Sequence, residues 1–181
     1  PKGLYNENKV DIVLTGDSFT EGYSVHSNET ISAVLRQLDF NAINVGKGGS
    51  GSLIELAALK EYAEPLKPKI VLWVYFVNDL IELNEEMQSS LLRKYLNEDD
   101  YSQNLISRQE EIDGVLINYN QSEWKRVMKN RIINILKLYN LRKMINLKPT
   151  LTSASTLHIS IFRDVLQQSK QMVSEWGGKM Y

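Results

Sequence analysis

Three short polar segments carry the residues that could do chemistry, and each of them follows an apolar run. They read GDSFTEG from Gly16, GKGGSGS from Gly46 and VND from Val77. Ser18 could attack a carbonyl carbon, which requires a base for its proton and donors for the oxyanion that forms. The Ser18 N–H, a glycine N–H of the second segment and the Asn78 amide are candidate donors. The pattern favours acyl transfer through a serine.

The elements that must position these segments alternate between strand and helix. Residues 10–15, 40–45 and 69–76 are short apolar runs typical of buried parallel strands, and helical patterns cover 28–38 and 52–66. This βαβαβ order predicts right-handed crossovers and a three-layer α/β/α sandwich with a parallel sheet. Ligands bind outside the carboxyl ends of such strands, so the three polar segments should open on one edge.

Two helix starts can be predicted from side chains that accept backbone hydrogen bonds. Asn28 is a candidate N-cap for the first helix, and Ser52 with Glu55 forms the S-x-x-E capping box of the second. The first helix should turn one apolar face inward. That face consists of Ile31, Val34, Leu35 and Leu38.

Capping also offers an alternative role for the candidate site residues. Ser18 alone is more typical of a helix cap than of a nucleophile, and we expect it to combine both roles. Asp17 and Asp79 could form a metal pair, but an aspartate before a helix more often caps N–H groups. We therefore expect no metal and no cofactor.

Taken together, the three segments resemble the first three sequence blocks of the SGNH (GDSL-type) hydrolases. GDSFTEG places Ser18 on the nucleophile, and INVGKGGSGS, an N-x-G-x-x-G match, places Gly49 on the oxyanion-hole glycine. VND places Asn78 on the oxyanion asparagine, with Phe76 or Val77 where the family has glycine. The resemblance implies the flavodoxin-like fold of that family and a serine ester hydrolase or acyltransferase, with small acyl esters or acetylated carbohydrates as substrates.

The fourth block of the family, D-x-x-H, supplies the catalytic base and its carboxylate partner, and it does not occur in this sequence. The two histidines, His26 and His158, do not match it. We therefore expect the catalytic Asp and His, with one or more further strands, to lie beyond Tyr181, so that this chain by itself is inactive or incomplete. The alternative is a non-catalytic module on the same frame that binds glycans or a partner protein.

The middle of the chain, 82–157, is interpreted as a helical insertion after the third strand. Residues 82–113 hold nine acids and three bases, whereas 123–148 hold eight bases and one acid. The basic stretch is amphipathic, so it could contact an anionic membrane surface, although a solvated face is the more ordinary interpretation. After it, a long helix should end at Gly177, and Lys179 should open another strand.

Composition limits the class of protein. A chain of 181 residues is the size of one domain, and its net charge of −1 argues against nucleic-acid binding. It holds no cysteine, which excludes disulfides and thiolate metal sites. No apolar run is long enough to span a membrane. Relatives with an insertion at this point favour an extracytoplasmic location, with any signal or anchor preceding Pro1.

Overall fold

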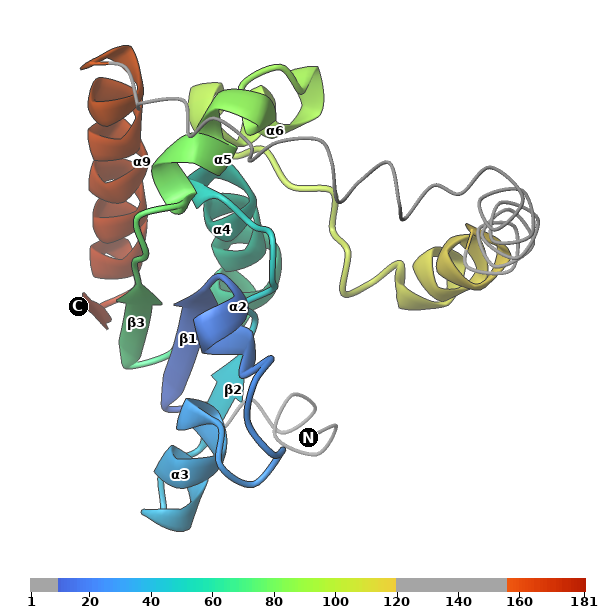
Figure 1. Ribbon diagram of the computed structural model, residues 1–181, viewed down its shortest axis with the longest axis vertical. Helices are drawn as coiled ribbons and strands as arrows, with labels where there is room; N and C mark the ends of the chain where they lie inside the picture. Colours follow the sequence, from blue (N-terminus) through green and yellow to red (C-terminus); the bar gives the residue numbers. More distant parts are fainter. Residues whose placement is uncertain (1–9, 120–155) are drawn as a thin grey trace, which may run out of the picture. The chain divides into compact units, whose positions relative to one another are not determined.

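A computed structural model of the chain describes residues 10–119 and 156–181 and contains one parallel β-sheet (Figure 1). The strands lie in the order β2-β1-β3-β4, and every pairing between them is parallel. Their bounds are β1 Ile12–Gly16, β2 Ala42–Asn44, β3 Ile70–Val74 and β4 Lys179–Met180. The predicted α/β class and parallel sheet are confirmed.

Helices connect the strands and follow the third one. They are α2 Ser18–Glu21, α3 Ile31–Gln37, α4 Ser52–Ala58, α5 Asp79–Glu86, α6 Ser90–Asn97 and α9 Thr156–Glu175. α4 continues without a break into a π-helical turn, η1 (Leu59–Ala63), and a 3₁₀ turn, η2 (Glu64–Leu66). The chain therefore stays helical from Ser52 to Leu66, as the sequence pattern predicts.

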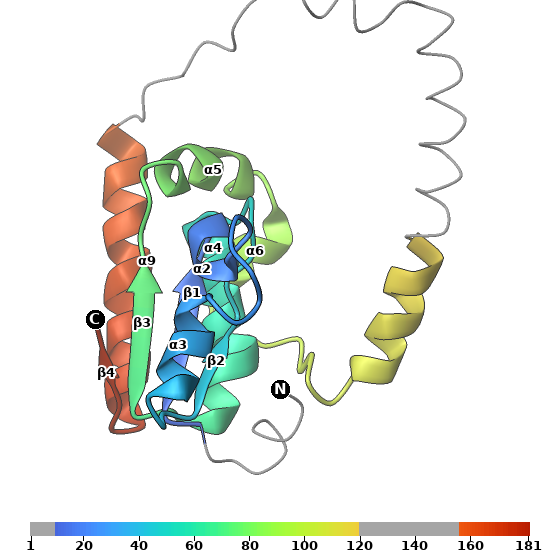
Figure 2. The same ribbon diagram turned by 60° about the horizontal axis from the view of Figure 1, so that its bottom comes forward.

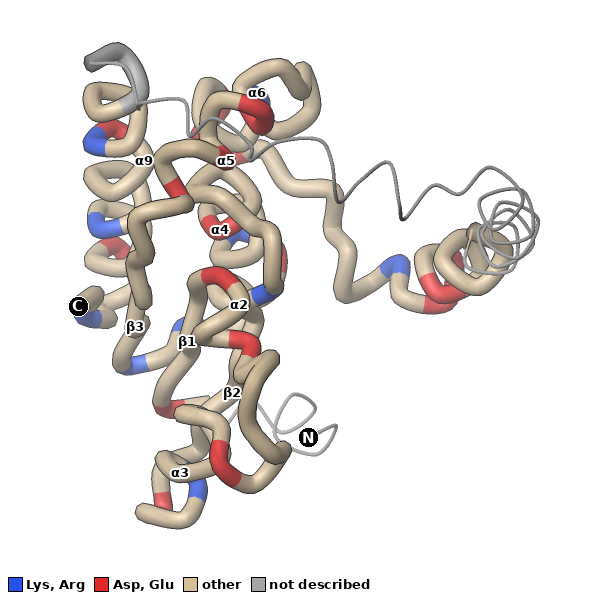
Figure 3. The backbone as a smooth tube through the Cα atoms, viewed as in Figure 1, with Lys and Arg blue, Asp and Glu red and all other residues tan. Residues whose placement is uncertain are grey.

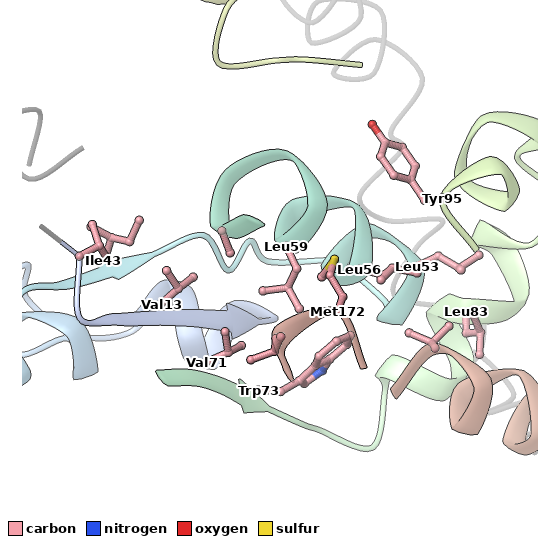
Figure 4. Packing of buried hydrophobic residues seen from close by; sticks show 14 residues of the cluster. Val13, Ile43, Leu53, Leu56, Leu59, Val71, Trp73, Leu83, Tyr95 and Met172 are labelled. Carbon is pink, nitrogen blue, oxygen red and sulfur yellow. The ribbon is translucent and has the colours of Figure 1, made fainter. Parts of the chain in front are cut away.

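The larger hydrophobic core lies on one face of the sheet, where Val13 of β1 and Val71 of β3 point toward α4 and α9 (Figure 4). Leu53, Leu56 and Leu59 pack there with no exposed surface. Val165 and Val173 of α9 join the same cluster. Because α4 packs against the sheet through this core, the position of its first turn is restrained, and so is the end of the loop that precedes it.

The opposite face is covered by α3, although not by the predicted apolar stripe. Leu35 packs on a small cluster of β1 and β2 residues, and Ser32 and Ala33 are the buried positions of the helix. Ile31, Val34 and Leu38 are 42%, 43% and 61% exposed, so the predicted inward face is wrong for three of its four residues. The small side chains of Ser32 and Ala33 are the ones that α3 buries instead.

The first turn of α3 corrects a second prediction. Its N-cap is Thr30, whose hydroxyl accepts the Ala33 N–H at 3.2 Å, and not Asn28. Asn28 lies in the turn before the helix, where its carbonyl accepts from Gln37. Both residue types can cap, so the cap position follows from where the turn after α2 ends.

The range predicted as an insertion, 82–157, spans parts of two compact units. α5 and α6 pack against α4 within a unit that comprises Pro1–Asn104 and Ser153–Tyr181. Leu105–Thr152 form a second unit, in which residues 109–119 are helical. The basic stretch 123–148 lies outside the described residues. Within the described ranges, no helix has both the length and the apolarity that crossing a membrane requires.

The end of the chain agrees with the sequence pattern. α9 stops at Glu175, and Gly177 follows with a φ of 85°, a left-handed conformation that glycine adopts without strain. β4 then pairs with β3, with Lys179 opposite Ile70. The predicted helix stop and the predicted strand start are both confirmed.

Candidate functional site

The candidate site forms at the carboxyl ends of β1 and β3, where Asp17 joins two of the three polar segments. Its Oδ2 accepts the Ser18 hydroxyl at 3.4 Å and the Asn78 side-chain amide at 3.2 Å. Gly16 and Val74 are opposite each other in the sheet, so both segments leave it at the same level. Sixty-one residues apart in sequence, Asp17 and Asn78 are thus brought together with Ser18.

Ser18 is the first residue of α2 and not its cap. The cap is Asp17, whose Oδ1 accepts the Phe19 N–H at 2.9 Å, so the expected combination of both roles in Ser18 is wrong. The capping role predicted for Asp17 is confirmed. The four residues of α2 give a very short helix, so individual N–H donors matter more here than a helix dipole.

The second polar segment reaches Ser18 through a carboxylate on α2. Glu21 Oε2 accepts the Gly48 N–H at 2.7 Å, and Glu21 Oε1 pairs with Lys47 Nζ at 3.1 Å. These two partners, the Gly48 N–H first, hold the pKa of Glu21 below its usual value. A Cβ placed on Gly48 would lie 3.3 Å from Ser18 Cβ, so the serine leaves little room for a side chain at this position of the loop.

Gly49, the residue after Gly48, is exposed. Its φ of 77° is left-handed, and a Cβ there would meet no atom within 4 Å. Among the described residues no protein acceptor is found for its N–H, and none for the Ser18 N–H. The structure therefore places the three predicted residues, Ser18, Gly49 and Asn78, around one edge of the sheet.

Close backbone contacts hold the first two segments together beneath the site. The Asn44 side chain donates to the Thr20 carbonyl and accepts the Gly46 N–H at 2.8 Å. A Cβ on Gly46 would lie 2.7 Å from Thr20 Cγ2, and one on Gly16 would lie 2.6 Å from the Val74 carbonyl oxygen. Only glycine fits at these two positions.

The start of α4 is capped from another helix, which corrects the predicted capping box. Glu86 of α5 accepts the Gly51 N–H at 2.6 Å and the Leu53 N–H at 2.9 Å. Gly51 is the N-cap, and Ser52 lies one position inside the helix, so Glu55 is too far along to reach back. Glu86 thereby joins the second polar segment to the helix that follows the third.

Two further acids are buried behind the site (Figure 3 marks the acidic residues of α2, α4 and α5 in red). Burial, with the nearby charge of Asp79, raises the pKa of Glu55 to about 9. Burial likewise raises the pKa of Asp79 to about 6, although its carboxylate accepts the Phe76 N–H at 2.8 Å. In the described ranges no group of three acid or histidine side chains could hold a metal ion. The hydrogen bond between the Phe76 N–H and the Asp79 carboxylate restrains the turn that contains Asn78.

The rim of the site is aromatic. Phe19, next to Ser18, and Phe76, two residues before Asn78, have ring centroids 4.7 Å apart. They are 61% and 43% exposed, so they offer an apolar surface beside the serine. An acyl or sugar substituent could bury part of that surface on binding.

Neither histidine is placed as a base by the described structure. His26 is exposed in the turn after α2, and over residues 10–119 and 159–181 no hydrogen bond joins its ring to Ser18. His158 belongs to α9, but its side chain lies outside the described residues. In that part of the chain the Ser18 hydroxyl donates only to Asp17, which already caps α2.

Comparison with known proteins gives no relative for this chain. No family model, no curated protein and no solved structure matches it.

Sequence reasoning missed Glu21 and Glu86, the two carboxylates that tie the loops together. Glu21 lies inside GDSFTEG, but its partner Gly48 comes 27 residues later. Glu86 reaches back 35 residues to Gly51. The available signal was the row of N–H groups in a glycine-rich loop, which need acceptors when they are buried.

Proposed function

We propose that this protein is a serine acyl-ester hydrolase of the SGNH type. The observation that carries the proposal is that Ser18 and Asn78 both donate to Asp17, beside a loop in which a Cβ on Gly48 would lie 3.3 Å from Ser18 Cβ. It supports a nucleophile and an oxyanion donor in one place, with Gly49 within the adjoining loop. Helices on both faces of a parallel sheet are compatible with the fold of that family.

In the proposed reaction Ser18 Oγ bonds to the acyl carbon, and its proton passes to a base. The Ser18 and Gly49 N–H groups and the Asn78 amide stabilise the oxyanion, and the alcohol leaves with a proton. Water then attacks the acyl-serine and releases the acid. Removing one oxyanion donor typically slows such a step by about 10²–10³-fold.

The proposed substrates are small acyl esters or O-acetylated carbohydrates. The exposed rings of Phe19 and Phe76 leave the approach to Ser18 open at the rim. A small acyl group has room beside the Gly49 backbone, where a Cβ would meet nothing within 4 Å.

The test is acylation of Ser18 by p-nitrophenyl acetate, with imidazole added as an external base and intact-mass detection of the acetyl-protein. We expect one acetyl group, mapped by peptide digestion to Ser18, formed faster with imidazole. Ser18→Ala should abolish the label, and Asn78→Ala should slow its formation by about 10²-fold. The exposed residue Ser27 provides the matched control Ser27→Ala, which should change nothing.

A second candidate function is a non-catalytic module that binds an acetylated glycan or a protein in the same pocket. The observation that favours it is that the described residues bring no histidine to Ser18. A protein that binds acetylated oligosaccharide by calorimetry, while Ser18 stays unlabelled with imidazole present, would support this candidate against the esterase.

A further inference from the structure

The second polar segment needs an external restraint if it is to present a backbone donor. It holds Gly46, Gly48, Gly49 and Gly51, and glycine loses more backbone freedom on ordering than any other residue. A donor is effective only when it is already in place, because reorganisation during the reaction removes the benefit. Something must therefore fix the peptides on either side of Gly49.

Inside the loop, the backbone supplies part of that restraint. The Lys47 N–H donates to the Gly16 carbonyl at 3.0 Å, and the Ser50 N–H donates to the Lys47 carbonyl at 3.1 Å. These bonds fix the two ends of the turn. They leave the Gly48 peptide, which directly precedes Gly49, without a backbone acceptor.

Glu21 fills that place. Over the described ranges, it is the one side chain outside the loop that accepts an N–H of residues 47–50, through its 2.7 Å bond to Gly48. Its second oxygen holds Lys47 at 3.1 Å, so both carboxylate oxygens are engaged with consecutive loop residues. Hydrogen bonds to an ionised group are about twice as strong as neutral ones.

Glu21 also lies on the same short helix as the proposed nucleophile, Ser18. It lies three residues after Ser18 on α2, where residues three apart share a face. A Cβ on Gly48 would be 3.3 Å from Ser18 Cβ and 2.9 Å from Glu21 Oε2, so both side chains lie close to the same glycine, which donates its N–H to Glu21. One short helix therefore carries both the nucleophile and the group that places the donor loop.

A role for Glu21 as the base fits less well. Both of its oxygens already accept a hydrogen bond, and these partners favour the charged form, which makes the carboxylate a poor proton acceptor. The Ser18 hydroxyl donates to Asp17 and not to Glu21.

We propose that Glu21 is a positioning residue, whose carboxylate fixes the Gly48 peptide and thereby holds the Gly49 N–H as an oxyanion donor to Ser18. This inference rests on the proposed function, since the donor has a purpose only if Ser18 is acylated. It assigns to Glu21 a role in the rate of acylation and not in the stability of the fold.

The experiment compares the wild type with Glu21→Gln and Glu21→Ala, and with Glu110→Ala as a control for the loss of an exposed carboxylate elsewhere. Two quantities are measured in each protein: the rate of Ser18 acetylation by p-nitrophenyl acetate with imidazole, and hydrogen exchange of the Gly48 amide by NMR. Thermal unfolding reports the stability of each variant.

We expect Glu21→Ala to slow acetylation by about 10- to 100-fold and to expose the Gly48 amide to exchange, with little change in melting temperature. Glu21→Gln keeps an oxygen acceptor, so it should restore most of the rate and the protection. Glu110→Ala should match the wild type.

Equal acetylation rates, or equal Gly48 protection, in the wild type and Glu21→Ala would overturn this inference and leave the proposed function standing. A slower Glu21→Ala that is also globally unfolded, with Glu21→Gln equally slow but folded, would likewise overturn it. A wild type that is never labelled at Ser18 would overturn both, so the two failures are distinguishable.

Discussion

At the scale of single residues, the buried carboxylate of Asp17 holds the candidate nucleophile, Ser18, close to a candidate oxyanion donor, Asn78. Asp17 is 2% exposed and accepts three groups, the Phe19 N–H, the Ser18 hydroxyl and the Asn78 amide. A hydrogen-bonded carboxylate that caps a helix cannot rotate freely. Asp17 therefore fixes the first segment and the third relative to each other, as Glu21 fixes the first and the second.

The small space between Gly48 and Ser18 leads to a prediction at this scale. Gly48→Ala adds a Cβ at 3.3 Å from Ser18 Cβ, which is tight enough to move the loop, whereas the clash with Glu21 falls on a flexible side-chain end. We expect acetylation of Ser18 to slow by about tenfold or more, because a displaced donor stabilises the oxyanion poorly. Stability should fall by no more than about 1 kcal/mol.

Gly49→Ala is the matched comparison. Its φ of 77° makes alanine strained by about 1–2 kcal/mol, yet no atom lies within 4 Å of the new Cβ. It should therefore lower the melting temperature more than Gly48→Ala does, and it should affect the serine less. A Gly48→Ala protein that is acetylated at the wild-type rate would show that the added Cβ does not displace the donor loop.

At the scale of elements, α4 and α5 depend on each other. α4 begins without a side-chain cap of its own, and its buried first turn takes the Glu86 carboxylate from the end of α5. Burial raises the pKa of Glu86, and the N–H groups of Gly51 and Leu53 lower it in part. The hydrogen bonds between Glu86 and the first turn of α4 therefore restrain the C-terminal end of the loop that contains Gly49.

Glu86→Ala should destabilise the protein by about 2–4 kcal/mol, because it leaves two buried N–H groups without acceptors. Glu86→Gln retains one oxygen and should cost about half as much. Glu85 on the same helix is exposed, so Glu85→Ala should stay within about 0.5 kcal/mol of the wild type. Urea denaturation measures all three, and a Glu86→Ala protein as stable as Glu85→Ala would contradict the capping role.

The elements show what could be predicted from the sequence and what could not. Apolar runs located the strands, since burial of a parallel strand leaves an unbroken run such as IVLWV in β3. Local pattern failed where a distant partner decides the outcome. Ser52 and Glu55 have the spacing of a capping box, but the helix begins one residue earlier, so the Glu55 N–H donates to the Gly51 carbonyl and Glu86 accepts the Gly51 and Leu53 N–H groups. Likewise, α3 buries Ser32 and Ala33 in place of its apolar stripe.

At the scale of the whole molecule, a surplus of buried acid lies behind the candidate site. α9 lies alongside β3 and β4, on the sheet face that carries the larger hydrophobic core (Figure 2). The buried acids are Glu55 of α4 and Asp79 of α5. Glu55 is 1% exposed and Asp79 is not exposed at all, and no salt bridge to either is found among the described residues. Buried carboxyls of this kind remain protonated more readily than free ones.

This surplus predicts a protein that loses stability as the pH rises. The unfolded chain ionises Glu55 near 4.5, whereas the folded chain holds its proton up to a pKa of about 9. For Asp79 the corresponding values are 3.8 and about 6. Between those limits the folded state binds more protons than the unfolded state, so the free energy of unfolding falls with rising pH. Each group should account for a loss on the order of 3 kcal/mol by pH 7.

Urea denaturation at pH 5, 7 and 9 tests this, because the Asp79 contribution is lost mainly below pH 6 and the Glu55 contribution continues to fall up to about pH 9. Glu55→Gln cannot ionise, so it should be more stable than the wild type at pH 8 and should flatten the profile between pH 6 and 9. Glu111→Gln, at an exposed carboxyl whose pKa Arg108 lowers, should leave that part of the profile unchanged. A wild type that is more stable at pH 9 than at pH 5 would mean that Glu55 is charged in the folded protein.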